Sequence, residues 1–431
     1  MGDINKLLSD LKELDDSLVS CMHCGMCQAV CPVYKTTLKE ADVTRGKIIL
    51  LENLAHKVAK DAGGVNDKLN LCLLCGSCQA NCPSGVQVLD IFFKARAIVA
   101  EYLGFSPVQK AIFKGILQHP KLFNSLLQMG AKLQGPFVRE ANTTVGTSRA
   151  PLLNSIIGER HFPRLAETPF NSQCPSLDTP AGPSGLRVAF FPGCVTDKMF
   201  PGVAAATLKV LQHYGVGVFL PSGLACCGIP AVASGDMKTY KNLVQQNIDA
   251  LSKGDFDYLV TPCATCTATI KETWPKLAEG LSATSQEKIR LIASKTVDLT
   301  AFLVNVVKIP LDNSRAKKSS KATYHDSCHM RNSLGVTAEP RKVIRGATGY
   351  EYVEMPGADA CCGSGGSFTL KHYDISKKVG SVKRNAVVAS KADVVMATCP
   401  ACMLQLMDMH SQHNDNIKVM HVIEALAETL P

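Results

Sequence analysis

Cysteine spacing is the strongest chemical signal in this sequence. Of the 19 cysteines, 18 fall into two matched pairs of clusters. The first pair repeats C-x2-C-x2-C-x3-C-P, with Cys21, Cys24, Cys27 and Cys31, then Cys72, Cys75, Cys78 and Cys82. The second pair repeats a longer unit, with Cys194, Cys226, Cys227, Cys263 and Cys266, then Cys328, Cys361, Cys362, Cys399 and Cys402. Thiolates at such spacings hold iron and sulfide, so the pattern predicts several iron–sulfur centres.

A disulfide framework is the main alternative for so many cysteines. No apolar run that could act as a secretory signal follows Met1, and residues 3–16 carry seven charged side chains instead. At 431 residues the chain can also bury hydrophobic cores without covalent cross-links. We therefore expect a cytoplasmic protein whose clustered cysteines bind metal, with Cys174 left as a free thiol.

The first pair of motifs predicts two [4Fe-4S] clusters with crossed ligands. In this spacing the first three thiolates wrap one cluster, and the fourth ligates the other cluster of the domain. Cluster one is thus assigned to Cys21, Cys24, Cys27 and Cys82, and cluster two to Cys72, Cys75, Cys78 and Cys31. Zinc is the alternative metal, but four-cysteine zinc sites rarely combine this spacing with a following proline.

The second pair of motifs offers five thiolates in each unit, one more than a tetrahedral zinc ion or an ordinary cubane needs. Adjacent cysteines such as Cys226 and Cys227 cannot both reach one ion in the same loop geometry without strain. Two metal ions or an opened cluster would accommodate them. Gly228 and Gly363, which follow the two cysteine pairs, should let the chain turn sharply there.

Two kinds of element must position these cysteines. Apolar residues at helical spacing between Ile48 and Val58 separate the first two motifs and predict a helical ferredoxin-type domain rather than a compact β-rich one. From Arg187 onwards, short β-prone runs end at cysteines and alternate with helical segments, and the whole pattern repeats, with Cys194 recurring as Cys328. This predicts two pseudo-symmetric α/β repeats with parallel strands and ligands at the strand ends.

The overall expectation is an α+β chain with five parts. These are a helical di-cluster ferredoxin domain (1–105), a helical connector (106–137), a linker rich in Pro, Ser, Thr and Gly (138–186), a first Cys-Cys-Gly domain (187–320) and a second Cys-Cys-Gly domain (321–431). Lys110, Lys114, Lys121 and Lys132 punctuate the connector. They predict either a helix pair packed on the core with a solvated basic face, or a face that docks on a partner or on lipid head groups.

Charge and hydropathy limit the possible partners. No segment provides the continuous apolar run of a membrane span, so we expect a cytoplasmic protein, either free or peripheral on the inner face of the cytoplasmic membrane. Residues 94–140 carry a net charge of +5, whereas residues 1–20 carry −3. The basic stretch lacks aromatic interleaving, which argues against nucleic acid and favours an anionic membrane surface or an acidic partner subunit.

The sequence resembles the iron–sulfur subunits of glycolate oxidase and D-lactate dehydrogenase. The resemblance rests on Cys21-Met-His-Cys-Gly-Met-Cys with Cys31-Pro32, Thr44-Arg45-Gly46, Cys82-Pro83-Ser84-Gly85-Val86 and both Cys-Cys-Gly units, in the same order over nearly the whole chain. The wider group includes heterodisulfide reductase subunits, in which each Cys-Cys-Gly unit holds a non-cubane four-iron cluster on five cysteines. This chain keeps all five in both units, which implies one or two further non-cubane iron–sulfur clusters.

The resemblance implies an electron-transfer subunit of a flavin-dependent glycolate or D-lactate dehydrogenase. The sequence has neither a dinucleotide fingerprint nor a phosphate loop, so no hydride chemistry is expected on this chain alone. A separate FAD-binding subunit would oxidise the substrate, and electrons would pass to quinone or another acceptor. The alternative is a catalytic subunit that reduces disulfides at the Cys-Cys-Gly clusters. His325 and His329, which flank Cys328, either hydrogen-bond a nearby carbonyl or sulfur or deliver protons to a bound quinone or disulfide.

Overall fold

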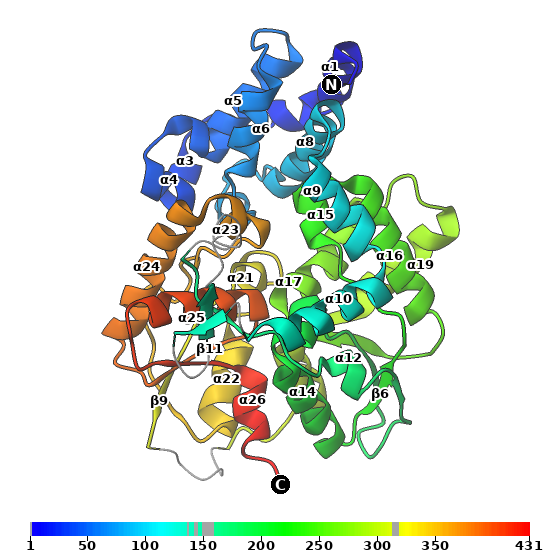
Figure 1. Ribbon diagram of the computed structural model, residues 1–431, viewed down its shortest axis with the longest axis vertical. Coiled ribbons are helices and arrows are strands. Elements are labelled where there is room, and N and C mark those ends of the chain that lie inside the picture. Colours follow the sequence, from blue (N-terminus) through cyan, green and yellow to red (C-terminus); the bar gives the residue numbers. More distant parts are fainter. Residues whose placement is uncertain (1, 136–137, 142–144, 149–158, 313–318) are drawn as a thin grey trace. The chain divides into compact units, whose positions relative to one another are not determined.

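The computed structural model describes residues 2–135, 138–141, 145–148, 159–312 and 319–431 (Figure 1). The chain divides into two compact units. Unit 1 contains Met1–Gln118, Gly228–Asn242 and Gly363–Val379, and unit 2 contains His119–Cys227, Leu243–Cys362 and Gly380–Pro431. Each later segment of unit 1 thus begins at the glycine that follows a cysteine pair.

Unit 1 is helical, and its described residues contain no strand. Its elements are α1 (Ile4–Lys12), α2 (Asp15–Val19), α3 (Met26–Val30), α4 (Pro32–Thr37), the 3₁₀ helix η1 (Glu40–Asp42), α5 (Thr44–Ala55), α6 (Ala62–Asn70), α7 (Ser77–Ala80), α8 (Val88–Leu103), α9 (Pro107–Lys110), the π-helix η2 (Ala111–Leu117), α15 (Ile229–Ala233) and α23 (Ser367–Lys371). Two longer helices, α16 (Met237–Leu251) and α24 (Tyr373–Ala389), begin in unit 1 and end in unit 2. The prediction of a helical rather than β-rich ferredoxin-type domain is confirmed.

Short polar caps and an apolar interior explain the helices of unit 1. The side chain of Asp3 accepts a hydrogen bond from the backbone N–H of Asn5 and so caps α1. Helix α1 packs on α5 and α8, and its Leu11 is buried with Leu51 of α5 and Phe92 of α8. At Gly46, a Cβ atom would lie 2.0 Å from the carbonyl oxygen of Glu40, so only glycine lets α5 approach η1 this closely.

Unit 2 contains two large sheets whose corresponding strands follow the same order. The first runs β4-β6-β5-β7-β8, and only the edge strand β4 is antiparallel. Its elements are β4 (Leu177–Asp178), β5 (Arg187–Phe190), α13 (Cys194–Met199), α14 (Pro201–His213), β6 (Gly217–Leu220), β7 (Tyr258–Thr261), α17 (Ala264–Ala268), the π-helix η3 (Thr269–Thr273), α18 (Trp274–Lys276), α19 (Ala283–Lys295), β8 (Thr296–Asp298), α20 (Leu299–Ala301) and the π-helix η4 (Phe302–Val307).

The second sheet runs β10-β9-β11-β12, and all of its strands are parallel. Its elements are β9 (Lys321–Tyr324), α21 (Cys328–Asn332), α22 (Ala338–Ala347), β10 (Glu351–Tyr352), β11 (Val394–Ala397), α25 (Pro400–Gln412), β12 (Lys418–His421) and α26 (Val422–Ala427). Strands β9, β10 and β11 correspond in order and position to β5, β6 and β7 of the first sheet. The predicted pair of pseudo-symmetric α/β repeats with parallel strands is confirmed.

One hydrophobic core joins the two repeats of unit 2. It contains Val188 of β5 and Val203 of α14 from the first repeat, and Val395 of β11 and Leu426 of α26 from the second. All four side chains are completely buried. Helix α14 packs directly on α26, which in turn packs on α22. The two repeats therefore fold around a shared interior, which holds their strand ends in a fixed relation.

The predicted linker (138–186) contains regular structure in its described parts. Strands β1 (Val138–Glu140), β2 (Val145–Ser148) and β3 (Phe162–Pro163) form a small antiparallel sheet, and α12 (Phe170–Gln173) follows. Strand β4 extends the first large sheet because Leu177 and Asp178 pair with Leu220 and Phe219. A polar, proline-rich composition thus gave no sign of these short pairings, and that of β4 depends on a strand distant in sequence.

The predicted connector (106–137) is helical where it is described, with α9, η2 and α10 (Pro120–Leu133). Lys110 and Lys132 lie among the described side chains, whereas the side chains of Lys114 and Lys121 lie outside the described part. Exposed apolar residues follow one another along α10 at helical spacing, namely Leu122, Leu126, Met129 and Leu133. None of the described helices is long and apolar enough to cross a membrane.

Candidate iron–sulfur sites

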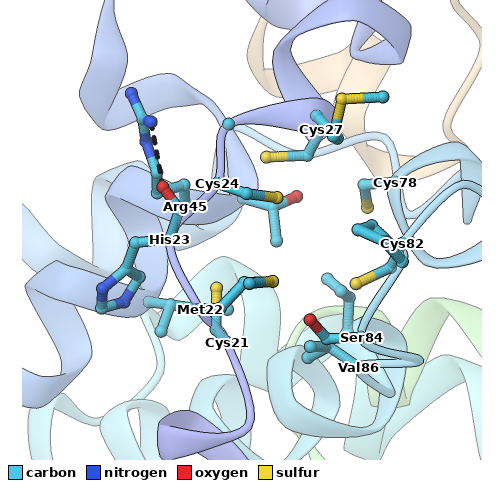
Figure 2. Close-up of a pocket in the computed structure, with 16 residues that line it drawn as sticks. Cys21, Met22, His23, Cys24, Cys27, Arg45, Cys78, Cys82, Ser84 and Val86 are labelled. Carbon is cyan, nitrogen blue, oxygen red and sulfur yellow. Dashed lines mark hydrogen bonds between the residues drawn. The ribbon is translucent and has the colours of Figure 1, made fainter.

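The first candidate site is a hollow in unit 1 that the loop before α3 and the segment after α7 enclose. Figure 2 shows the sulfur atoms of Cys21, Cys24, Cys27, Cys78 and Cys82 facing this common space. Most of the remaining wall is apolar, with Met22, Met26, Ile48, Pro83, Val86 and Val88. The hollow thus brings together the four cysteines predicted for cluster one, with Cys78 as a fifth.

Arg45 secures the loop that carries the first three of these cysteines. Its Nη1 donates a hydrogen bond to the backbone oxygen of His23 at 3.1 Å (Figure 2). Its Nε donates to Oε1 of Glu40 at 2.7 Å. The hydrogen bond from Arg45 lowers the pKa of the Glu40 carboxyl group. Arg45 belongs to the Thr44-Arg45-Gly46 motif, so this motif holds the cysteine loop through its arginine side chain.

The second candidate site is a neighbouring hollow in unit 1, lined by Cys31, Cys72, Cys75 and Cys78. These are the four cysteines predicted for cluster two. Backbone N–H groups already point at two of the sulfurs, from Tyr34 to Cys31 at 3.4 Å and from Leu74 to Cys72 at 3.5 Å. Such N–H groups are the donors that tune iron–sulfur centres.

A buried lysine distinguishes the second hollow from the first. Lys47 lies in its wall with only 2% of its surface exposed, and its Nζ donates a hydrogen bond to the backbone oxygen of Asp42. Burial lowers the pKa of Lys47, whereas the charges of Cys72 and Cys31 raise it. Burial also raises the pKa of Cys78 to about 12. A cation beside buried thiols is suited to a ligand set that carries negative charge.

The third candidate site gathers the five cysteines of the first repeat. Cys194 begins α13 just after β5, Cys226 and Cys227 lie in the loop between β6 and α15, Cys263 follows β7, and Cys266 lies in α17. Gly228 has φ of +96°, and a side chain at this position would clash with the ring of Tyr240. The sharp turn predicted after the cysteine pair is therefore present, as it is at Gly363, where φ is +88°.

Buried polar side chains hold the loop that carries Cys226 and Cys227. The side chain of Asn247 accepts a hydrogen bond from the backbone N–H of Ala225 at 2.8 Å and donates one to the backbone oxygen of Cys226 at 3.0 Å. The indole N–H of Trp274 donates to the backbone oxygen of Cys227 at 2.9 Å. Each adjacent cysteine is thus oriented by its own backbone anchor, which lets both sulfurs point into one site.

The fourth candidate site gathers the cysteines of the second repeat in the same way. Cys328 begins α21 after β9, Cys361 and Cys362 precede α23, Cys399 follows β11, and Cys402 lies in α25. Nζ of Lys383 donates hydrogen bonds to the backbone oxygens of Gly357 at 2.7 Å and Ala358 at 2.9 Å. Hydrogen bonds with Cys361 and Cys402, and then the nearby His325, lower the pKa of Cys362 well below its ordinary value.

The ten thiols of the two repeats form one continuous band. The Sγ atoms of Cys194 and Cys226 lie 3.6 Å apart. Successive thiol hydrogen bonds then follow the order Cys226, Cys227, Cys266, Cys263, Cys399, Cys402, Cys362, Cys361, Cys328. The step from Cys263 to Cys399 joins the two repeats.

The two histidines near Cys328 lie in different surroundings. Nδ1 of His329 lies 3.1 Å from Oγ1 of Thr265, which is also 3.3 Å from Sγ of Cys399. His325 is completely buried, and one of its ring nitrogens groups with the sulfurs of Cys362 and Cys402, all within 4.8 Å of one another. His329 therefore contacts a hydroxyl group beside a cysteine, whereas His325 faces the cysteines themselves.

The thiols fit iron–sulfur clusters by their chemistry. None of the 19 cysteines, all of which lie in the described part of the chain, forms a disulfide. Hydrogen bonds among neighbouring thiols, and then burial, raise the pKa of Cys226, Cys266 and Cys361, so bare thiolates would be unfavourable at these positions. Bound iron supplies the positive charge that allows crowded thiols to ionise. Cys174 stands apart, half-buried in unit 2, where only burial raises its pKa.

Several residues of these sites were not singled out from the sequence. Lys47 and Trp274 lie in helices, where the sequence pattern predicts packing and marks no single residue. Asn247 and Lys383 occupy matching positions of the two repeats, at the same sequence offset as the matched cysteines of the C-x2-C segments. An alignment of the two repeats over their helices as well as their cysteines would have found this pair.

Fold and ligand sets together define an iron–sulfur protein with a ferredoxin-type domain and paired cysteine-rich repeats. Residues 17–86 match the family model of the 4Fe-4S dicluster domain, and residues 188–271 and 322–407 each match that of the cysteine-rich domain. The chain is 30% identical over 411 residues to the probable glycolate oxidase iron-sulfur subunit of Bacillus subtilis, covering 94% of this chain and 92% of that protein. The chain belongs to this family of iron–sulfur subunits.

Two further relatives have names that refer to other substrates. A fumarate reductase (CoM/CoB) subunit from Methanothermobacter marburgensis is 28% identical over 95% of this chain and 72% of its own length. Lactate utilization protein A of Bacillus licheniformis is 36% identical over 56% of this chain and 99% of its own length. The relatives named as subunits belong to oxidoreductases, so the family transfers electrons within larger enzymes.

Proposed function

We propose that this chain is the electron-transfer subunit of a flavin-dependent glycolate or D-lactate dehydrogenase. A separate FAD-binding subunit oxidises the 2-hydroxy acid, and this chain passes the electrons towards quinone or another acceptor. The observation that carries the proposal is the gathering of 18 cysteines, none of them in a disulfide, into two hollows and one continuous band. When bound, iron–sulfur clusters at such thiols accept and release single electrons.

The ligand assignment follows the grouping of the thiols. Cys21, Cys24, Cys27 and Cys82 hold the first [4Fe-4S] cluster, and Cys72, Cys75, Cys78 and Cys31 hold the second. Cys78 lines both hollows, but the spacing of its motif assigns it to the second. Two further non-cubane clusters are held by the five cysteines of each repeat. The crossed assignment is supported because each hollow contains the fourth cysteine of the other motif.

The protein's own residues bury these sites and hold their loops. Apolar side chains such as Ile48 and Phe92 line much of the hollows of unit 1. The anchors Asn247, Trp274 and Lys383 fix the two cysteine pairs. A fixed ligand set changes little between charge states, and this small reorganisation suits rapid electron transfer.

The choice of substrate rests on the relatives. One is named as a subunit of glycolate oxidase and another as a lactate utilization protein. Both names refer to 2-hydroxy acids. An FAD-binding subunit is inferred because such acids lose two electrons as a hydride, whereas iron–sulfur clusters take electrons singly.

The first test is to purify the tagged chain without oxygen, together with whatever accompanies it. We expect a flavoprotein to co-purify and the complex to reduce a dye when glycolate or D-lactate is added. Substitution of Cys227 and Cys362 by serine should abolish dye reduction while the substrate still bleaches the flavin. Oxidation of either acid by the cluster-loaded chain alone would contradict the proposed division of labour.

A second candidate function is the reduction of disulfides at the cysteine-rich sites. The contact between Cys263 and Cys399 favours it, because a disulfide needs two electron donors side by side. This function requires that an added disulfide reoxidise the reduced chain stoichiometrically, without any flavoprotein. Reoxidation by quinone analogues but not by disulfides would leave the dehydrogenase relay as the function.

The location of the complex is part of the same proposal. We infer a cytoplasmic protein that meets the inner face of the membrane, or an acidic partner subunit, through the basic stretch around Lys110 and Lys132. The exposed apolar residues of α10 lie in this stretch. Binding to vesicles that contain anionic lipid, and release by salt, would distinguish the membrane surface from a protein partner.

A further inference from the structure

The two cysteine-rich sites share their five cysteines but differ in one residue beside them. Three positions before the first cysteine, the first repeat has Phe191 and the second has His325. The backbone N–H of Phe191 donates to the oxygen of Val260, and that of His325 donates to the oxygen of Met396, both at 2.9 Å. Val260 and Met396 each lie three positions before a matching cysteine. Phe191 and His325 therefore occupy the same place in the two repeats.

The imidazole of His325 lies against the second set of cysteines. The residue is completely buried, and one ring nitrogen lies within 4.8 Å of the sulfurs of Cys362 and Cys402. Among the described residues, the imidazole interacts with the thiol of Cys362, and neither ring nitrogen hydrogen-bonds with another side chain or with the backbone. A buried imidazole without such partners is costly, so this ring requires a polar group on the side where the cysteines converge.

The first repeat indicates what kind of partner this is. There the same five cysteines gather around a position that holds phenylalanine, which cannot bind a metal. The five thiolates are therefore a sufficient ligand set, and His325 is not needed to complete it. The remaining role for an imidazole at this place is to donate an N–H hydrogen bond to a sulfur.

A second pair of matching positions differs in charge. Asn247 of α16 and Lys383 of α24 each anchor the loop of a cysteine pair from the same place in the repeat. Asn247 is neutral, whereas Lys383 brings an ammonium group that is only 1% exposed. Acidic neighbours do not cancel this charge. Arg341 binds both carboxylate oxygens of Asp326 at 2.8 Å, and Arg331 lies 2.8 Å from a carboxylate oxygen of Asp359.

We propose that the site of Cys328, Cys361, Cys362, Cys399 and Cys402 has the higher reduction potential of the two, set by His325 and Lys383 as positioning and tuning residues. The inference rests on the proposed function, because both sites must hold iron–sulfur clusters. Reduction adds negative charge to a site. Hydrogen bonds to its sulfurs and a nearby ammonium group stabilise that charge. The imidazole of His325 and the ammonium group of Lys383 have no counterpart at the matching positions of the first repeat, which hold Phe191 and Asn247.

The test exchanges the residues between the repeats in the full-length chain. His325→Phe and Lys383→Asn copy the first repeat into the second, and Phe191→His with Asn247→Lys does the reverse. Each protein is assembled with iron without oxygen and titrated at fixed pH, with electron paramagnetic resonance as the readout. Cys227→Ser and Cys362→Ser assign the signals to the two sites. Lys391→Asn, at an exposed lysine of unit 2, controls for the loss of a positive charge.

We expect each of the first two variants to lower the potential of the second site by about a tenfold change in the one-electron equilibrium, which is ~59 mV. The reverse variant should raise the reduction potential of the first site, and Lys391→Asn should leave both potentials unchanged. His325→Gln, which keeps an N–H donor, should recover part of the shift. Unchanged potentials in fully loaded variants would overturn the inference alone.

Two other results would also refute it, for different reasons. If the unaltered chain carries no redox-active iron at the cysteine-rich sites, the proposed function loses its basis and the inference falls with it. If both His325→Phe and His325→Gln lose iron from the second site only, the imidazole is a metal ligand rather than a hydrogen-bond donor.

Discussion

The thiol of Cys263 hydrogen-bonds with the thiol of Cys399, its counterpart in the other repeat. Both residues open a C-x2-C segment at the end of a central strand, β7 in one sheet and β11 in the other. The backbone N–H of Ala264 also donates to the oxygen of Thr398 at 3.1 Å. The two repeats thus meet at their ligand loops, and the sites of unit 2 adjoin each other instead of lying at opposite ends of a symmetric pair.

Crossed ligation in unit 1 predicts opposite effects for two matched variants. Cys82→Ser should disturb the cluster held by Cys21, Cys24 and Cys27, because Cys82 shares their hollow. Cys31→Ser should disturb the cluster held by Cys72 and its neighbours for the same reason. Iron content and paramagnetic spectra of the two variants, each subtracted from those of the unaltered chain, will separate the signals.

The control for this pair is Cys174→Ser, which changes a cysteine outside every candidate site. It should leave iron content and spectra unchanged. The crossed assignment fails if Cys82→Ser removes the same signal as Cys75→Ser, because Cys75 lines only the other hollow.

The positive charge of Lys47 should raise the reduction potential of the neighbouring cluster of unit 1. Lys47→Met keeps the length of the buried side chain but removes its charge beside Cys31 and Cys72. Loss of a nearby positive charge disfavours the reduced state. We expect the potential of that cluster to fall by ~59 mV or more, a tenfold change in the one-electron equilibrium. Redox titration measures it, with the exposed Lys39→Met as the matched control.

The fold was predictable where a local pattern determined it. Helical spacing around Ile48 identified the helical first domain, and the recurrence of Cys194 at Cys328 identified the two repeats. The short strand β4 was missed because Leu177 and Asp178 pair with a strand far along the chain, and nothing in their own composition requires that partner. The extension of unit 1 by residues after each cysteine pair was missed for the same reason.

The candidate sites also contain residues that the sequence could identify and residues that it could not. The spacing of the cysteines marks them as ligands, so the ligand sets could be grouped from the sequence. The supporting side chains could not, because Asn247 and Trp274 belong to helices whose pattern only predicts packing. The difference between Phe191 and His325 was visible in the sequence, but its meaning depended on knowing that both backbones make the same hydrogen bond.

Asn247 predicts that the first cysteine-rich site depends on one amide side chain. Asn247→Leu leaves the N–H of Ala225 and the oxygen of Cys226 without partners in a buried loop. Each such loss costs about 1–3 kcal/mol. We expect a lower melting temperature and loss of iron from this site, with the second site retained. Asn242→Leu, at an exposed position of the same helix, should change neither the melting temperature nor the iron content.

The buried carboxyl group of Asp298 should make the free energy of unfolding depend on pH. Burial raises its pKa to about 6, and its Oδ2 has no hydrogen-bond partner in the described structure, while Oδ1 accepts hydrogen bonds from Thr300 and Ala301. Because the pKa is higher in the folded state, the stabilising effect of the protonated carboxyl is complete below the unfolded pKa, near 4, and is lost as pH rises through 6.

Asp298→Asn keeps the acceptor oxygen without the charge. We expect its melting temperature to exceed that of the unaltered chain increasingly between pH 5 and 7, with a gain of at most about 3 kcal/mol in the free energy of unfolding. Asp255→Asn, at an exposed position, should show a difference that does not vary with pH. A constant difference for Asp298→Asn as well would mean that this carboxyl group stays ionised in the fold.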